Sequence, residues 1–101
     1  MPSQSSGPAI PASVEAKQLA PEIRAELFTL DKSTADTVAR HLVAAGELLD
    51  SDPEAALAHA QAARTRSGRI AAIREAVGIA AYYCGDWAQA LAEFRAARRM
   101  G

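Results

Sequence analysis

Apolar side chains recur every three or four residues along most of the chain after residue 20, a spacing that predicts amphipathic helices. One such set predicts a short helix over residues 21–30, in which Pro21 suits the first turn: Ile23, Leu27 and Leu30. A second set predicts a longer helix that begins near Ser33, where Asp36 completes a capping box, and ends near residue 49: Val38, Leu42, Ala45 and Leu49. Each helix therefore presents one apolar face for burial.

Polar and glycine residues mark the ends of three further helices. Asp52 can accept hydrogen bonds from free amides and a proline follows it, so a third helix starts here and ends near residue 65. Gly68 ends this helix, because glycine readily adopts the left-handed conformation common just past a helix end. A fourth helix spans residues 70–83, after which Gly85 releases the chain and Asp86 caps the fifth helix.

The composition also predicts an all-α fold. The 101 residues include 25 alanines but only two prolines beyond residue 20, and alanine loses no side-chain entropy in a helix. Half of the residues are apolar, which suits one small soluble domain. Residues 1–18 hold three prolines, four serines and few large apolar groups. We therefore expect a flexible tail over residues 1–18 and a folded domain over residues 19–101.

The chain resembles itself when it is shifted by 34 residues. Of the 31 positions from residue 37 to residue 67, nine are identical to the residue 34 positions later. The identical pairs include Arg40 with Arg74 and Asp52 with Asp86, as well as an Ala-Leu-Ala run in each copy. A fixed period of this length predicts two copies of one helix-turn-helix unit.

The second copy resembles the tetratricopeptide repeat in its signature positions. Gly78 matches the small residue of the first helix, and the turn with its following aromatic is matched by Gly85, Asp86 and Trp87. The second helix matches the small, large, small series of the family with Ala90, Phe94 and Ala97. Small side chains let helix axes approach to about 8–10 Å, while one aromatic ring fills the gap beneath.

The resemblance implies antiparallel helix-turn-helix repeats in an α-α superhelix, preceded by a short capping helix. Repeat one covers residues 34–67 and repeat two covers residues 69–101; repeat one departs from the pattern, with Ala60 at the aromatic position and Ser51 at the turn glycine. Stacked repeats usually need about three units to bury a continuous core. We therefore expect the chain to continue into further repeats or to dimerise, with self-association through the terminal helix: Leu91, Phe94 and Met100.

The resemblance also implies a function, because the first helices of such repeats line a groove that binds a polypeptide. We expect a non-catalytic protein-protein interaction module, or scaffold, with these partner-binding residues: Val38, His41, Leu48, Leu49, Glu75, Ile79, Tyr82 and Tyr83. The small Ala45 and Ala72 complete the expected lining of the groove. This lining is largely apolar and lacks the basic residues with which some family members bind acidic peptides, so an apolar helix or strand is the expected ligand. In the alternative interpretation, residues 13–30 cover this surface as packing.

The net charge of −1 conceals an uneven distribution of charge. Residues 1–58 carry four basic and nine acidic side chains (4 − 9 = −5), whereas residues 59–101 carry seven basic and three acidic ones (7 − 3 = +4). The arginines of the second half form two groups that suit an acidic protein or phosphates: Arg64, Arg66 and Arg69, then Arg95, Arg98 and Arg99. The alternative function is therefore an RNA- or nucleic-acid-associated accessory protein, although arginine also pairs ordinarily with helix dipoles.

Nothing in the sequence supports a catalytic, metal or cofactor site. His41 and His59 lie on different predicted helices, with no cysteine or carboxylate at metal-ligand spacing. Cys84 has no neighbouring histidine and is expected to be a buried or half-buried thiol. No glycine loop that would hold a phosphate and no nucleophile elbow are present. We therefore expect no enzyme activity and no cofactor.

The sequence predicts a cytoplasmic location. A single cysteine excludes an internal disulfide and fits a reducing compartment. The start of the chain lacks a cationic and apolar leader, and the longest uncharged apolar-leaning run, residues 76–85, is far shorter than the roughly 20 residues that cross a bilayer. Nine arginines against two lysines, with abundant alanine, are typical of a GC-rich bacterial genome. We expect a bacterial protein that does not enter the membrane.

Overall fold

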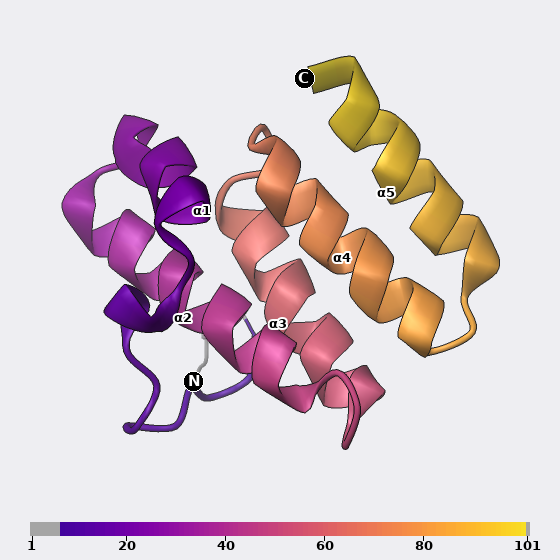
Figure 1. Ribbon diagram of the computed structural model, residues 1–101, viewed down its shortest axis with the longest axis horizontal. Helices are drawn as coiled ribbons and strands as arrows, with labels where there is room; N and C mark the ends of the chain where they lie inside the picture. The colour runs from indigo at the N-terminus through magenta and orange to yellow at the C-terminus, as the bar shows by residue number, and fades with distance from the viewer. Residues whose placement is uncertain (1–6, 101) are drawn as a thin grey trace, which may run out of the picture.

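The computed structural model describes residues 7–100, and within this range the secondary structure is entirely helical (Figure 1). The elements are η1 (Ala16–Gln18), α1 (Pro21–Glu26), η2 (Leu27–Thr29), α2 (Lys32–Leu48), α3 (Pro53–Arg66), α4 (Ala71–Tyr83) and α5 (Trp87–Met100), where η denotes a 3-10 turn. The expectation of an all-α fold is confirmed for the described residues.

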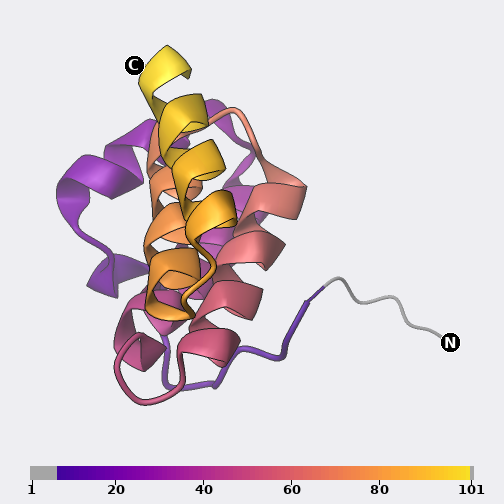
Figure 2. The same ribbon diagram turned by 90° about the vertical axis from the view of Figure 1, so that its right-hand side faces the viewer.

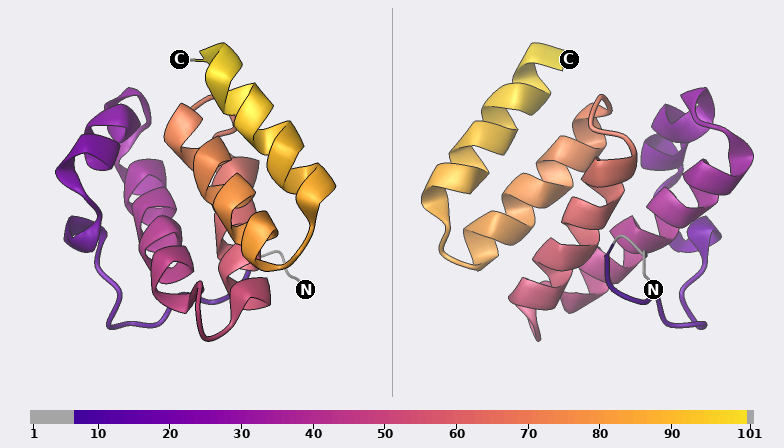
Figure 3. Two further views of the ribbon diagram at one scale, coloured as in Figure 1. Left: turned by 45° about the vertical axis from the view of Figure 1, so that its right-hand side comes forward. Right: turned by 180° about the vertical axis from the view of Figure 1, so that it is seen from behind.

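Each long helix packs against the next one along the chain. α2 contacts α3, α3 contacts α4 and α4 contacts α5, whereas the contact between α2 and α4 is smaller. The views of Figure 3 place the N-terminal elements beside α2 at one edge of this row and α5 at the opposite edge. Short connections dictate this arrangement, because helices joined by a few residues must fold back as antiparallel neighbours.

Local capping explains where α3 and α5 begin. The side chain of Asp52 accepts a hydrogen bond from the backbone N–H of Ala55 at 3.1 Å, and that of Asp86 accepts one from the backbone N–H of Gln89 at 3.1 Å. Between α4 and α5, Gly85 has a φ of 81°, which is the left-handed conformation expected of it. These three predictions are confirmed.

Two predicted helix ends are wrong. α2 is capped by Asp31 rather than Ser33, because the Asp31 carboxylate accepts a hydrogen bond from the backbone N–H of Thr34 at 3.1 Å. Gly68 is not left-handed, since Gly7 and Gly85 alone have positive φ among the described residues, and α3 ends in an extended Ser67. The role of Gly68 is to offer its carbonyl oxygen to the guanidinium Nε of Arg74 at 2.8 Å.

The N-terminal segment needs a further correction, because the expected flexible tail is packed where it is described. Residues 1–6 of that tail lie outside the described range. Val14 is buried, and Arg40 of α2 donates hydrogen bonds from Nε to the carbonyl oxygen of Val14 at 2.9 Å and from Nη2 to that of Pro11 at 3.3 Å. The prediction failed because one distant guanidinium adds hydrogen bonds to the few that the segment makes within itself, such as the one from the backbone N–H of Val14 to the carbonyl oxygen of Pro11 at 3.0 Å.

The helix interfaces are built from small side chains. Alanine is the commonest buried residue, and the largest fully buried side chains are Ile73, Val38 and Val77. At the interface of α4 with α5, Gly78 faces the ring of Phe94 so closely that a Cβ on Gly78 would lie 2.6 Å from the ring atom Cε1. The glycine is therefore required for the close approach of these two helices.

Two glycine-to-alanine changes test this packing. We expect Gly78→Ala to lower the free energy of unfolding by about 1–3 kcal/mol, because the added methyl group displaces Phe94. Gly46→Ala is the matched control, since a Cβ there meets nothing within 4 Å. It should raise the free energy of unfolding by about 0.5–1 kcal/mol through helix propensity. Urea unfolding of both variants measures these values, and a gain in stability for Gly78→Ala would contradict the interpretation.

Candidate functional site

An apolar hollow of about 130 Å³ lies between α2 and α4, and we refer to it as the α2/α4 hollow. Three residues of α2, the Leu49 that follows it and two residues of α4 line it: Leu42, Ala45, Gly46, Leu49, Ala76 and Ile79. The hollow exists because alanine and glycine leave the space between the two helices partly unfilled, while leucine and isoleucine form its walls. An apolar hollow of this kind suits an aliphatic side chain of a ligand.

Tyrosine side chains extend the apolar surface beyond the hollow. Tyr83 lies one helical turn after Ile79, on the same side of α4, and is 48% exposed. The Tyr82 ring lies next to two others, with its centroid 5.0 Å from that of Trp87 and 6.4 Å from that of Tyr83, both in edge arrangements. Tyr83 therefore continues the hollow, whereas Tyr82 and Trp87 form an exposed aromatic pair at the turn between α4 and α5. Trp87 is 62% exposed, so its ring does not pack inside the hairpin of α4 and α5.

The structure brings only part of the predicted groove together. Leu49 and Ile79 line the α2/α4 hollow and Tyr83 extends it, whereas Leu48 is partly buried and Glu75 is exposed without lining the hollow. These positions lie near one another because α2 and α4 both pack against α3 and also contact each other.

Two residues of the predicted groove must be withdrawn from it. Val38 has no exposed surface and His41 is 2% exposed, so neither side chain is accessible to a partner. Val38 belongs to the core cluster that also contains Val14 and Leu19 of the N-terminal segment. This segment therefore covers part of the expected surface, in agreement with the alternative that we left open for residues 13–30.

Sequence analysis missed three residues that line the hollow: Leu42, Gly46 and Ala76. Leu42 and Ala76 are related by the 34-residue shift, and this relation was the available signal. The predicted groove positions came from the resemblance to the repeat family, whereas the hollow is formed by the sides on which α2 and α4 face each other.

His41 and His59 form a buried pair between α2 and α3. Their Nδ1 atoms are 2.9 Å apart, so one ring donates its Nδ1 proton and the other accepts with a bare nitrogen. Burial, the neighbouring His59 and the positive Arg66 and Arg40 lower the pKa of His41 to about 4, and burial also lowers the pKa of His59. Both rings are therefore neutral at pH 7 and act as a packed hydrogen-bonded pair.

This pair predicts a loss of stability in mild acid. His41 titrates near its ordinary pKa of 6.5 when unfolded and near about 4 when folded, so stability is complete above pH 6.5 and falls as the pH drops toward 4. We expect a loss of about 2 kcal/mol in the free energy of unfolding between pH 7 and pH 5. Urea titrations at each pH measure it. The double variant His41→Gln with His59→Gln should have a shallower slope, and an unchanged slope would refute the assignment.

In the structure, some of the predicted arginines are bonded within the fold and others are exposed. Glu93 of α5 is 4% exposed and forms ion pairs with Arg64 of α3 and with Arg74 of α4, the latter at 3.1 Å between Nη1 and Oε1. Arg64 therefore serves within the fold, and Arg66 donates a hydrogen bond from Nη1 to the carbonyl oxygen of Ala62 at 3.2 Å. The remaining predicted arginines are exposed: Arg69, Arg95, Arg98 and Arg99.

Glu93→Gln tests how much the ion pairs contribute. The amide keeps the shape of the side chain but removes the charge that two arginines share, so we expect the free energy of unfolding to fall by about 2–3 kcal/mol. Glu75→Gln, the same change at an exposed position of α4, should alter it by less than about 0.5 kcal/mol. Fluorescence of Trp87, the single tryptophan, reports the unfolding in urea. Equal losses in the two variants would contradict the buried role of Glu93.

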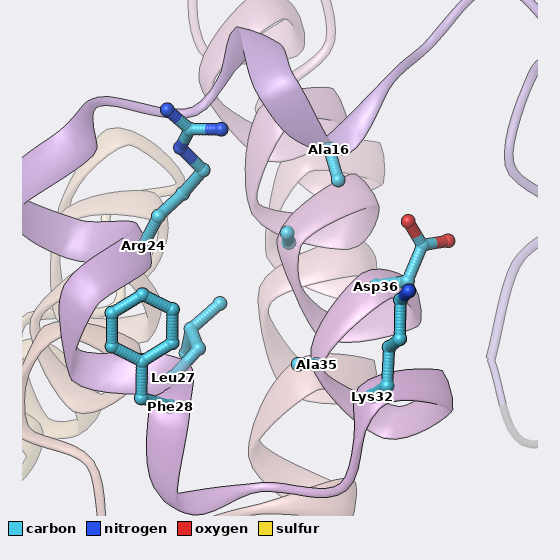
Figure 4. Close-up of a pocket in the computed structure, with 8 residues that line it drawn as sticks. Ala16, Arg24, Leu27, Phe28, Lys32, Ala35 and Asp36 are labelled. Carbon is cyan, nitrogen blue, oxygen red and sulfur yellow. The ribbon is translucent and has the colours of Figure 1, made fainter.

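A second hollow, of about 310 Å³, lies between the N-terminal elements and α2 (Figure 4). Figure 4 shows Arg24 and Phe28 on one side of it and Lys32 and Asp36 on the other. All four of these side chains are exposed, Phe28 by 86%, and the buried part of the lining is apolar. The hollow therefore lacks the buried polar groups that orient a small ligand.

The described residues offer little for metal or covalent chemistry. Within residues 7–100, no three histidine, cysteine or acidic side chains form a group that could hold a metal ion. Burial and the carboxylates of Glu54 and Asp86 raise the pKa of the half-buried Cys84, which favours the thiol over the nucleophilic thiolate. In the described part of the chain, no helix combines the length and the apolar character that crossing a membrane requires.

Comparisons with protein-family models, with curated proteins and with solved structures give no match to this chain.

Proposed function

We propose that this chain is a helical-repeat domain of the tetratricopeptide type, and that it binds a polypeptide partner without chemical catalysis. The α2/α4 hollow and the adjoining Tyr83 form the binding surface. The observation that carries the proposal is this apolar hollow, because it lies between the first helices of the two hairpins, where a repeat of this type receives its ligand.

The internal symmetry of the fold supports the repeat assignment. α2 with α3 and α4 with α5 are two hairpins in which the second helix starts from an aspartate cap, Asp52 in one and Asp86 in the other. These caps lie 34 residues apart and bond the backbone N–H three residues later in each case. The contact of Gly78 with Phe94 supports it further, because it is the small-against-aromatic contact that the signature positions require.

The chemistry of the surface indicates the kind of ligand. Within the hollow the walls are aliphatic and Ile79 is 40% exposed, so an aliphatic side chain of the partner would bury apolar area there. The hydroxyl of Tyr83 adds a hydrogen-bonding group at the rim of this apolar surface. We infer that the ligand is an apolar helix or extended segment, anchored by one or two aliphatic side chains.

The nucleic-acid alternative receives less support. Arg64 is engaged with Glu93, and the exposed aromatic rings of Tyr82 and Trp87 contact each other instead of lying as separate platforms among arginines. We therefore do not propose nucleic acid as the ligand of the α2/α4 hollow.

Selection of binding peptides tests the proposal. A displayed peptide library is screened against residues 1–101, and the affinity of each selected peptide is measured by calorimetry for the native chain and two variants. We expect Ile79→Glu to weaken binding about tenfold or more, because it places a charge in the apolar hollow. Met100→Glu is the control, since it introduces the same charge at an apolar residue of α5 that is 41% exposed and lies outside the hollow. Peptides that bind Ile79→Glu as tightly as the native chain would refute the site.

A further inference from the structure

The outward-facing side of α5 carries an exposed mixture of apolar and basic side chains. Trp87, Leu91, Arg95 and Arg98 fall within less than a third of the helix circumference, given about 100° per residue. Trp87 is 62% exposed and Leu91 is 50% exposed, and both arginines are also exposed. Figure 2 looks onto α5, and no other described element lies in front of it. We call these four residues the α5 outer face.

The chain contains a second version of this face, on α3, that is partly buried. Leu57, Gln61 and Arg64 of α3 lie 34 positions before Leu91, Arg95 and Arg98. Leu57 packs against the cluster formed by Ala45, Ala60 and Val77, which includes α4. The structure therefore shows what such a face binds, namely the hairpin of α4 and α5.

The two helices of that hairpin contact α3 through different kinds of side chain. The first helix, α4, supplies apolar side chains such as Val77 to the region of Leu57. The second helix, α5, supplies polar partners: Gln61 donates a hydrogen bond to the side-chain oxygen of Gln89 at 2.9 Å, and Arg64 pairs with Glu93. A partner hairpin that contacted α5 in the way that α4 and α5 contact α3 would place an apolar helix on Leu91 and a carboxylate beside Arg98.

We propose that the α5 outer face docks a helical hairpin of a partner protein, whose first helix packs small aliphatic side chains on Leu91 and whose second helix presents a carboxylate to Arg98. This docking is independent of the α2/α4 hollow, which lies on other helices. The carboxylate that faces Arg98 is the required polar group of the hairpin. Arg95 stands where α3 has the neutral Gln61, so a further carboxylate of the partner beside it would strengthen the docking.

Two observations favour a different protein over a second copy of this chain as the occupant. The first helix of each hairpin already packs against another element, α4 against α3 and α2 against η1 and η2, so its apolar side chains are less accessible to a second copy. In addition, pairing the α5 outer faces of two copies would bring Arg95 and Arg98 of one copy close to those of the other, and like charges repel at such an interface.

The test extends the chain by its own hairpin. A second copy of residues 68–101 is joined directly after Gly101, which keeps the 34-residue period, and the tryptophan of the copy is replaced by phenylalanine so that Trp87 remains the single reporter. We expect the urea midpoint for unfolding of residues 1–101 to rise in the extended chain. The fluorescence of Trp87 should change because the docked copy shields its ring from water, and the backbone amides of α5 should exchange hydrogen more slowly.

Matched variants separate docking from a general effect of the extension. Leu91→Gln should abolish the rise in the extended chain but leave the midpoint of residues 1–101 nearly unchanged, because Leu91 is 50% exposed there. Arg98→Glu should reduce the rise, and an additional change of the glutamate in the copy that corresponds to Glu93 into arginine should restore most of it. This charge exchange reports the specific pair, which loose hydrophobic association would not require.

Three results would overturn the proposal. The first is an extended chain whose midpoint and hydrogen exchange equal those of residues 1–101. The second is a native chain that is a dimer by light scattering and a monomer as Leu91→Gln, since the occupant is then a second copy. The third is tight binding of single-stranded RNA or duplex DNA at low salt that Arg95→Gln with Arg98→Gln abolishes, because the face then serves phosphates.

Discussion

Small side chains at the helix interfaces set how closely the helices pack, and the other features of the fold depend on that distance. The buried positions are mostly alanine, with only Ile73, Val38 and Val77 as larger side chains that are fully buried. Each alanine removes little apolar area from water, so many close backbone contacts must replace a few large side chains. The ring of Phe94 rests on Gly78 under the same constraint. The hollow between α2 and α4 is another result, because small residues there leave space that no neighbour fills.

Glu93 complements this packing by joining three helices through charge. Alanine surfaces are alike from one turn to the next, so they hold helices together without defining their positions along the axis. A carboxylate bound by Arg64 of α3 and Arg74 of α4 fits one position only, because guanidinium and carboxylate groups must meet in a fixed geometry. This buried group therefore orients α5 and, with it, the side of that helix that faces outward.

The sequence predicted what depends on neighbouring residues and failed where distant residues decide. Asp52, Asp86 and Gly85 act within one turn of the chain, so their roles could be inferred from the pattern alone. The burial of Val38 could not, because it requires the N-terminal segment to lie on α2, and that position depends on hydrogen bonds from Arg40 across 26 or more residues. For the site, the pattern identified the two helices and the residues Leu49 and Ile79, but not which sides of α2 and α4 face each other.

The two ends of the row of helices differ in exposure, because the N-terminal segment covers α2 whereas the outer side of α5 is exposed. At one end, Arg40 holds the N-terminal segment by hydrogen bonds to the carbonyl oxygens of Val14 and Pro11, so adding a hairpin there would first require breaking them. At the other end, a hairpin can be added to α5 without displacing any described element. Addition of a helical hairpin would therefore disrupt fewer existing contacts after α5 than before α2.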